Sequence, residues 1–180
     1  MISITKLVFY IGLILTSFLS CSISNLGHAN SCDNIKHSLL ETEITKEDAI
    51  ELYNNDECYF EVLKNIATGS EKWLDVGLAL YKYSDAGFSE QLNYAFGEAL
   101  GSNAEGVLLR ITDQEILLFV CSGPDGDDDK FDSFQNSYAE LTKRVTAVQK
   151  IQNLGIEDIK NKCLETLNKS IIDLRQYYTK

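Results

Sequence analysis

The chain has 180 residues, enough for one domain of ordinary size with one sizeable hydrophobic core. Its 27 acidic residues outnumber the 16 Lys and Arg residues, which gives a formal net charge of −11 at pH 7. A surface with this charge repels nucleic acids and anionic lipids, so we expect no nucleic-acid function. The acidity suits either simple solubility or binding to a partner protein with a basic cleft.

Residues 1–29 have the composition of a secretory signal peptide. They contain no acidic residue, one cation at Lys6 and an apolar run over residues 7–19. This run is too short to favour a membrane span, and small and polar residues follow it. Small residues near its end fit a signal-peptidase site, so we predict cleavage after Ala29. Residues 30–180 would then form a single helical domain in the periplasm or outside the cell.

Cys21 offers an alternative to free export. The sequence Phe18-Leu19-Ser20-Cys21 loosely resembles a bacterial lipobox, although Phe fits the first position of that motif poorly. Lipidation of Cys21 would make the protein an outer-membrane lipoprotein with a structural role. Without lipidation, we expect no association with the membrane after the signal peptide is removed.

Removal or lipidation of Cys21 leaves four cysteines, and an even number in an exported chain indicates two disulfides. Cys121 ends a hydrophobic run that the last two helices would cover, and Cys163 lies on the apolar face of the last helix. Of the three possible pairings we therefore predict Cys32–Cys58 and Cys121–Cys163. The cysteines lack the C-x-x-C spacing of a zinc knuckle, so we expect no metal site.

Helix-start signals and apolar residues at helical spacing alternate from residue 31 to residue 121. The only proline is Pro124, and no stretch alternates polar and apolar residues for long enough to predict a strand. The sequence therefore predicts an all-α fold, a compact multi-helix domain. Gly69 suits the left-handed position that ends a helix. The predicted helix caps are Thr45, Asp56, Ser70, Ser84-Asp85, Asn103 and Thr112.

The last two helices are expected to form a long antiparallel hairpin. Both carry apolar residues three and four positions apart, and a short turn over residues 153–155 joins them. The predicted stripes are Phe131, Phe134, Tyr138, Leu141, Val145 and Val148 on the first helix and Ile156, Ile159, Cys163, Leu167, Ile171 and Leu174 on the second.

The aromatic residues divide into a core group and a contact group. Tyrosine buries its ring while keeping a polar tip, which suits it to interfaces, so pairs of tyrosines close in the sequence are the better contact candidates. We expect Trp73, Phe88, Tyr94 and Phe96 in the core, and Tyr81, Tyr83, Tyr177 and Tyr178 at contacts.

Residues that could carry catalysis are scarce. The chain after the predicted cleavage site has one histidine, His37, and its cysteines are expected to be oxidised. Neither a Cys–His pair nor a Ser–His–Asp triad is easily built from these residues. A pair of carboxylates is always available among 27 acids, so it has no specificity. We therefore predict that the protein is not an enzyme and needs no cofactor.

Residues 122–129 form the clearest loop and are the predicted site of partner contact. Their acids would form a negative protrusion that enters a basic cleft; a solvated loop is the alternative. The alternating acids resemble the start of an EF-hand, but Lys130 stands where Gly is required and Asn136 where Glu belongs. Asp132 would cap the following helix. The predicted partner-binding residues are Asp125, Asp127, Asp128 and Asp129.

Several short sequences resemble a group of small exported all-helical proteins of Gram-negative bacteria. That group includes the periplasmic immunity proteins that block type VI secretion amidase toxins. The resemblance implies a helical periplasmic binder that inhibits a cell-wall hydrolase by blocking its cleft, and it assigns no functional residue by position. The residues that carry it are Gly69-Ser70, Trp73-Leu74, Ser84-Asp85-Ala86-Gly87, Ala99-Leu100, Val107-Leu108, Cys121 and Cys163-Leu164.

Overall fold

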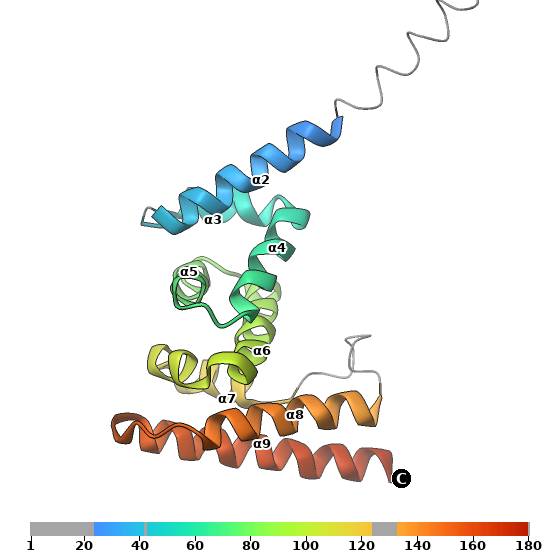
Figure 1. The fold of residues 1–180 in the computed structure, drawn as a ribbon. Helices are drawn as coiled ribbons and strands as arrows, with labels where there is room; N and C mark the ends of the chain where they lie inside the picture. Colours follow the sequence, from blue (N-terminus) through green and yellow to red (C-terminus); the bar gives the residue numbers. More distant parts are fainter. Residues whose placement is uncertain (1–23, 42, 124–132, 180) are drawn as a thin grey trace, which may run out of the picture. The chain divides into compact units, whose positions relative to one another are not determined.

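Every regular element in the described part of the chain is helical, which confirms the all-α prediction. The computed structural model describes residues 24–41, 43–123 and 133–179. The chain divides into two units between residues 41 and 42. Helix α2 (Ser24–Glu41) belongs to the first unit and the other helices to the second (Figure 1). These are α3 (Lys46–Tyr53), α4 (Asp56–Ala67), α5 (Glu71–Tyr81), α6 (Ala86–Arg110), α7 (Gln114–Cys121), α8 (Phe134–Gln149), the 3₁₀ turn η2 (Leu154–Ile156) and α9 (Glu157–Tyr178).

Helix α3 starts with the capping box that the sequence predicts. The Thr45 hydroxyl accepts a hydrogen bond from the backbone N–H of Asp48, and the Asp48 carboxylate accepts one from the backbone N–H of Thr45 at 2.8 Å. The hydrogen bonds from Thr45, the side-chain bond first, lower the pKa of Asp48. The box fixes the start of α3 through local contacts alone, which is why the sequence predicts it well.

Three other caps lie one residue away from their predicted positions. A cap must place its side-chain oxygen within reach of an N–H two or three residues ahead. Asn55 does so for the N–H of Cys58 at 3.1 Å, so Asp56 becomes the first helical residue. The observed caps are Asn55 in place of Asp56, Asp113 in place of Thr112 and Ser133 in place of Asp132.

Helix α6 runs through the middle of the second unit and contacts α4, α5, α7 and α8. Asn103, a predicted cap, interrupts it with non-helical angles (φ −146°, ψ 66°). The Asn103 amide donates to the carbonyl of Gly69 at 2.8 Å, and Gly69 has a φ of 76° that favours glycine. This contact therefore ties the end of α4 to the kink in α6.

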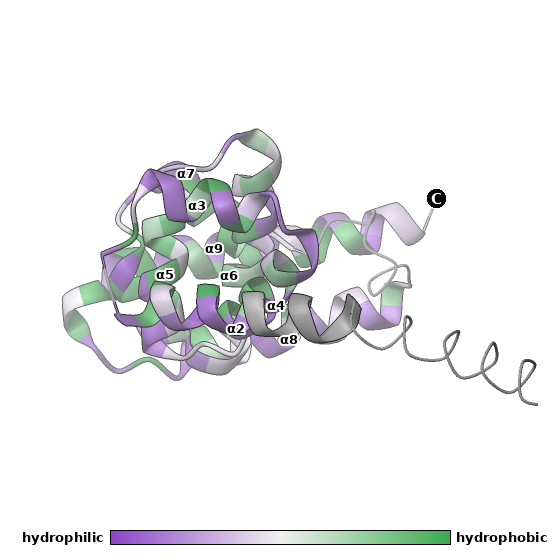
Figure 2. Ribbon diagram, turned by 90° about the horizontal axis from the view of Figure 1, so that it is seen from above, coloured by the Kyte–Doolittle hydropathy of each residue, from purple (hydrophilic) through white to green (hydrophobic). Residues whose placement is uncertain are grey.

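Helices α8 and α9 lie side by side as the predicted hairpin (Figure 1). Leu141, Val148, Cys163 and Leu167 are buried as expected. The stripe on α8 also includes Arg144, which the sequence did not predict to be buried. Figure 2 shows hydrophilic and hydrophobic residues alternating along the helices, as amphipathic helices require. Phe131 lies outside the described residues.

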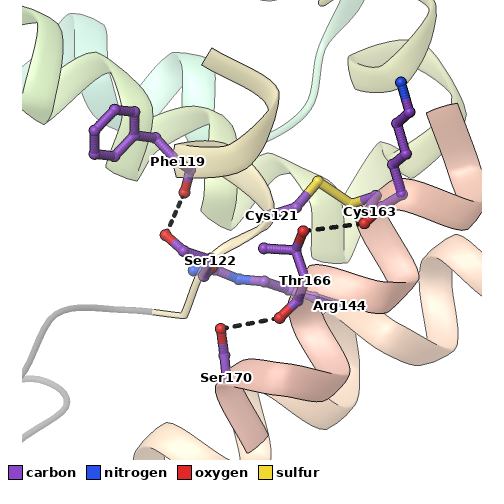
Figure 3. Close-up of a disulfide and its surroundings, with 8 residues drawn as sticks. Phe119, Cys121, Ser122, Arg144, Cys163, Thr166 and Ser170 are labelled. Atoms are coloured by element: carbon purple, nitrogen blue, oxygen red, sulfur yellow. Dashed lines mark hydrogen bonds between the residues drawn. A yellow bond between two sulfur atoms is a disulfide. The ribbon is translucent and has the colours of Figure 1, made fainter. Parts of the chain in front are cut away.

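Both predicted disulfides are present. Cys121, at the end of α7, is bonded to Cys163 on α9, with 5.2 Å between their Cα atoms (Figure 3). Cys32 and Cys58 are also disulfide-bonded. The first bond ties α7 to the hairpin, and both of its cysteines are fully buried.

Candidate functional site

The strongest candidate for a functional site is a pocket that we call the α6–α9 pocket. It has a volume of about 710 Å³, within the range of pockets that hold ligands. Residues of α6, α7, α8 and α9 line it, together with Tyr81 and the residues that follow α7. The lining residues that give it its character are Glu90, Asn93, Tyr94, Phe119, Asp173 and Tyr177.

The pocket lies beside the C-terminal part of α9, where the side chains of this helix are no longer buried. Cys163 and Leu167 are fully buried, whereas Ile172 and Tyr177 are exposed. The Cys121–Cys163 disulfide holds the end of α7 against the buried part of α9. The exposed part of α9 therefore faces the pocket with Asp173, Leu174 and Tyr177.

Three exposed aromatic side chains line the pocket. Phe119 is 64% exposed, Tyr177 is 75% exposed and Tyr94 is 39% exposed. A large aromatic ring that remains in water keeps most of its hydrophobic free energy available for a partner. Such residues are enriched at the centres of protein–protein interfaces.

The pocket also has a buried polar group that needs a hydrogen bond. Asn93 is 8% exposed, and its Oδ1 accepts no hydrogen bond within the described residues. An unsatisfied buried acceptor costs about 1–3 kcal/mol relative to one that is hydrogen-bonded. A ligand that brings a donor into the pocket would recover part of that free energy.

The charge of the lining is negative. Glu90 on α6 and Asp173 on α9 contribute carboxylates, and none of the described lining residues is Lys, Arg or His. The Glu90 carboxylate accepts a hydrogen bond from the Tyr94 hydroxyl at 3.1 Å. A carboxylate can accept several hydrogen bonds, so Glu90 retains capacity for a ligand.

Arg144 supports the pocket from within the core. It is 3% exposed, and its Nε donates to the Glu140 carboxylate at 2.9 Å. Its Nη1 donates to the carbonyl of Ser122, a lining residue, at 3.3 Å (Figure 3). A Cβ added to Gly97 would lie 2.7 Å from that Nη1, so glycine leaves the space that the guanidinium fills.

A smaller pocket of about 480 Å³ lies on the other side of Tyr94, between α4 and α6. Tyr94 lines both pockets. Gln91 in the smaller pocket has an Oε1 that is buried and accepts no hydrogen bond from any residue with a described position. This part of α6 therefore has two unsatisfied amide oxygens, one in each pocket.

The predicted partner-binding residues Asp125, Asp127, Asp128 and Asp129 lie outside the described residues, so their role stays a prediction. Ser122 and Gly123, which directly precede this acidic segment, line the α6–α9 pocket. Of the predicted contact tyrosines, Tyr81 and Tyr177 line the pocket too. Tyr178 contacts the ring of Phe134 at 5.6 Å between centroids.

The sequence prediction for Tyr94 was wrong, and Glu90, Asn93, Phe119 and Asp173 were not singled out. Tyr94 was expected in the core but is exposed. The signal was available, because Tyr94 is two residues from both Leu92 and Phe96, which are buried. Two residues span about 200° on a helix, so Tyr94 points away from the buried face.

Within residues 24–41, 43–123 and 133–179, no three His, Cys, Asp or Glu side chains are placed to hold a metal ion. None of the helices in those ranges is both long enough and apolar enough to cross a membrane. The described lining of the pocket includes serine hydroxyls, and neither histidine nor cysteine is among its described residues.

Comparisons with protein-family models, with curated proteins and with solved structures found no match to this chain.

Proposed function

We propose that this protein is exported and acts by binding another protein through the α6–α9 pocket. The observation that carries the proposal is the pocket itself, whose lining combines exposed aromatic rings with a buried amide oxygen that has no donor among the described residues. Binding would bury the rings and satisfy the amide, and both changes favour association. The two disulfides fit a protein that works in an oxidising compartment.

The specific form of the proposal is an immunity protein that inhibits a cell-wall-degrading toxin in the periplasm. The apolar N-terminal run, the disulfides and the resemblance to exported helical proteins support it. The net charge of −11 favours an enzyme with a basic cleft as the partner. In a co-expression test, the protein should protect cells from a peptidoglycan hydrolase sent to the periplasm. Killing of equal extent with and without the protein would exclude that hydrolase as the target.

The second candidate is an outer-membrane lipoprotein with a structural role, anchored through Cys21. The sequence Phe18-Leu19-Ser20-Cys21 favours it. The mature N-terminus separates the two forms, because lipidation leaves a protein that begins at Cys21 and carries fatty-acid label. A mature chain that begins at Asn30 without label would exclude the lipoprotein.

A photo-cross-linking amino acid at position 119 tests the binding surface. The matched control is position 154, because Leu154 is also an exposed apolar residue, at 85% exposure, but does not line the pocket. We expect position 119 to give a discrete adduct in the cell envelope and position 154 to give none. The cross-linked protein would then be purified and titrated with the wild type and with Phe119→Asp. Affinity should fall at least about tenfold with Phe119→Asp; adducts at both positions or at neither would contradict the proposal.

A further inference from the structure

We infer that the α6–α9 pocket binds an arginine side chain carried by the partner protein. This inference rests on the proposed function and names the chemistry of the segment that enters the pocket. It follows from the charge of the lining, the aromatic rings and the amide of Asn93.

The charge of the lining selects a cation. Glu90 and Asp173 come from different helices, α6 and α9, and no cationic residue is among the described residues that line the pocket. Arg175, which lies between the lining residues Leu174 and Tyr177 on α9, already has a partner. Its Nη2 donates to the Tyr138 hydroxyl at 3.0 Å, and its guanidinium lies 5.3 Å from the centre of that ring.

The rings and the amide select arginine among cations. A guanidinium is planar, stacks on aromatic faces and presents five N–H donors, whereas an ammonium is a compact charge that is strongly hydrated. Tyr94, Phe119 and Tyr177 supply exposed rings, and Asn93 supplies an acceptor that lacks a donor. A guanidinium offers a flat face for stacking and N–H donors for carboxylate and amide oxygens, and these are the groups that the lining presents.

The size of the pocket indicates that the arginine belongs to a longer segment. A volume of about 710 Å³ exceeds that of one side chain, so the residues next to the arginine also fit. Gly123 lines the pocket, and in the sequence Pro124 and then the acidic residues 125–129 follow it. A segment with further cations near its arginine would be favoured by this charge.

The experiment uses ¹⁵N-labelled protein purified after export and blocked Gly-X-Gly peptides, in which X is arginine, lysine or citrulline. Citrulline has nearly the shape of arginine but no charge. We expect the arginine peptide to shift the amide signals of residues 89–94 and 170–177. The lysine peptide should bind about threefold more weakly and the citrulline peptide at least about tenfold more weakly.

The variant Glu90→Gln/Asp173→Asn should weaken binding of the arginine peptide by about tenfold. The matched control is Glu115→Gln/Asp158→Asn, which removes the same charge from exposed residues that do not line the pocket. Equal binding of arginine and citrulline, equal loss in the two variants, or no shifts at about 10 mM peptide would overturn the assignment.

The cross-linking result separates this inference from the proposed function. A discrete adduct at position 119 without arginine preference would keep the protein-binding role and overturn the arginine site. Arginine preference without any cross-linked protein would keep the arginine site and overturn the protein partner.

Discussion

Two aromatic clusters flank the first turns of α6, and they differ in whether their polar groups are satisfied. In the first cluster, Tyr53 stacks on Phe88 with 4.0 Å between ring centres, and Tyr59 meets both rings edge-on. The Tyr53 hydroxyl donates to the carbonyl of Leu80 at 2.9 Å, and the Tyr59 hydroxyl donates to that of Phe88 at 3.0 Å. This closed cluster joins α3 and α4 to the end of α5 and the first turn of α6.

The second cluster is the α6–α9 pocket, where Tyr94, Phe119 and Tyr177 remain exposed and Asn93 lacks a donor. The same residue types thus stabilise the fold in one place and stay available in the other. The difference indicates that aromatic content alone does not identify a binding surface. What identifies it is a group of aromatic rings that remain exposed beside a buried polar atom that lacks a hydrogen bond among the described residues.

The largest expected difference between the clusters is in stability. Tyr59→Ala should lower the free energy of unfolding by about 3–5 kcal/mol, because Tyr59 is 2% exposed and its ring and hydroxyl are both engaged. Phe119→Ala should change it by less than about 0.5 kcal/mol, because that ring is exposed. Urea denaturation measures both. Similar losses in the two variants would show that the pocket aromatics serve the fold.

Removal of the disulfide between α7 and α9 should have the next largest effect. Cys163→Ser should cost about 2–4 kcal/mol in unfolding free energy, because the bond closes a loop with a sequence separation of 42. Cys121 should then react with a thiol reagent under denaturing conditions. The double variant Cys121→Ser/Cys163→Ser is the control without either thiol. A Cys121 that stays unreactive in the single variant would contradict the pairing.

Two glycines of α6 test the space around Arg144. Gly97→Ala should destabilise by about 1–3 kcal/mol, because the added methyl group would overlap the buried guanidinium. Gly87→Ala should stabilise by about 0.4–1 kcal/mol, since only the Asp85 carboxylate lies near that position, at 3.6 Å. Thermal unfolding of the two variants gives the comparison. Equal effects would mean that Arg144 moves aside without cost.

The titration of Tyr53 gives a smaller effect. Burial, and then the nearby charge of Asp85, raises the pKa of Tyr53 to about 12. A raised pKa means that Tyr53 stays protonated to a higher pH in the folded state than in the unfolded state, where tyrosines titrate near pH 10. Stability is thus full below about pH 10 and is lost as pH rises toward 12, by at most about 1.4 kcal/mol per pH unit for one proton. Tyr53→Phe should show a shallower loss over that range, and an equal slope in both proteins would contradict the assignment.

Local contacts explain most of what the sequence could predict. The capping box at Thr45, the left-handed Gly69 and the apolar stripes of the hairpin all depend on residues within a few positions of one another. The Cys121–Cys163 pairing was predictable because a stripe of helical period placed Cys163 on the buried face. The caps at Asn55 and Asp113 were missed by one residue, because neighbouring polar residues compete for the same backbone donors.

Contacts between distant segments explain what the sequence could not predict. Arg144 is buried because Gly97 on another helix leaves room for it and the Ser122 carbonyl accepts a hydrogen bond from it. The pocket depends on where along α9 the neighbouring helices stop burying its side chains, and no local sequence pattern specifies that point. Tyr94 is the exception, since its position on the helix already pointed away from Leu92 and Phe96.

A further small change in stability is expected at Asn93, and this variant tests whether the amide serves a binding site or the fold. Asn93→Leu should leave the unfolding free energy unchanged or raise it by up to about 1 kcal/mol, because it removes an acceptor that has no partner. The same variant should weaken binding of the arginine peptide, because it removes an oxygen to which the guanidinium donates. Tyr59→Phe, in the closed cluster, is the opposite case, because it deletes a hydroxyl that is hydrogen-bonded. It should lower the free energy of unfolding by about 1 kcal/mol. If Asn93→Leu costs as much as Tyr59→Phe, the amide serves the fold, and the contrast between the two clusters does not hold.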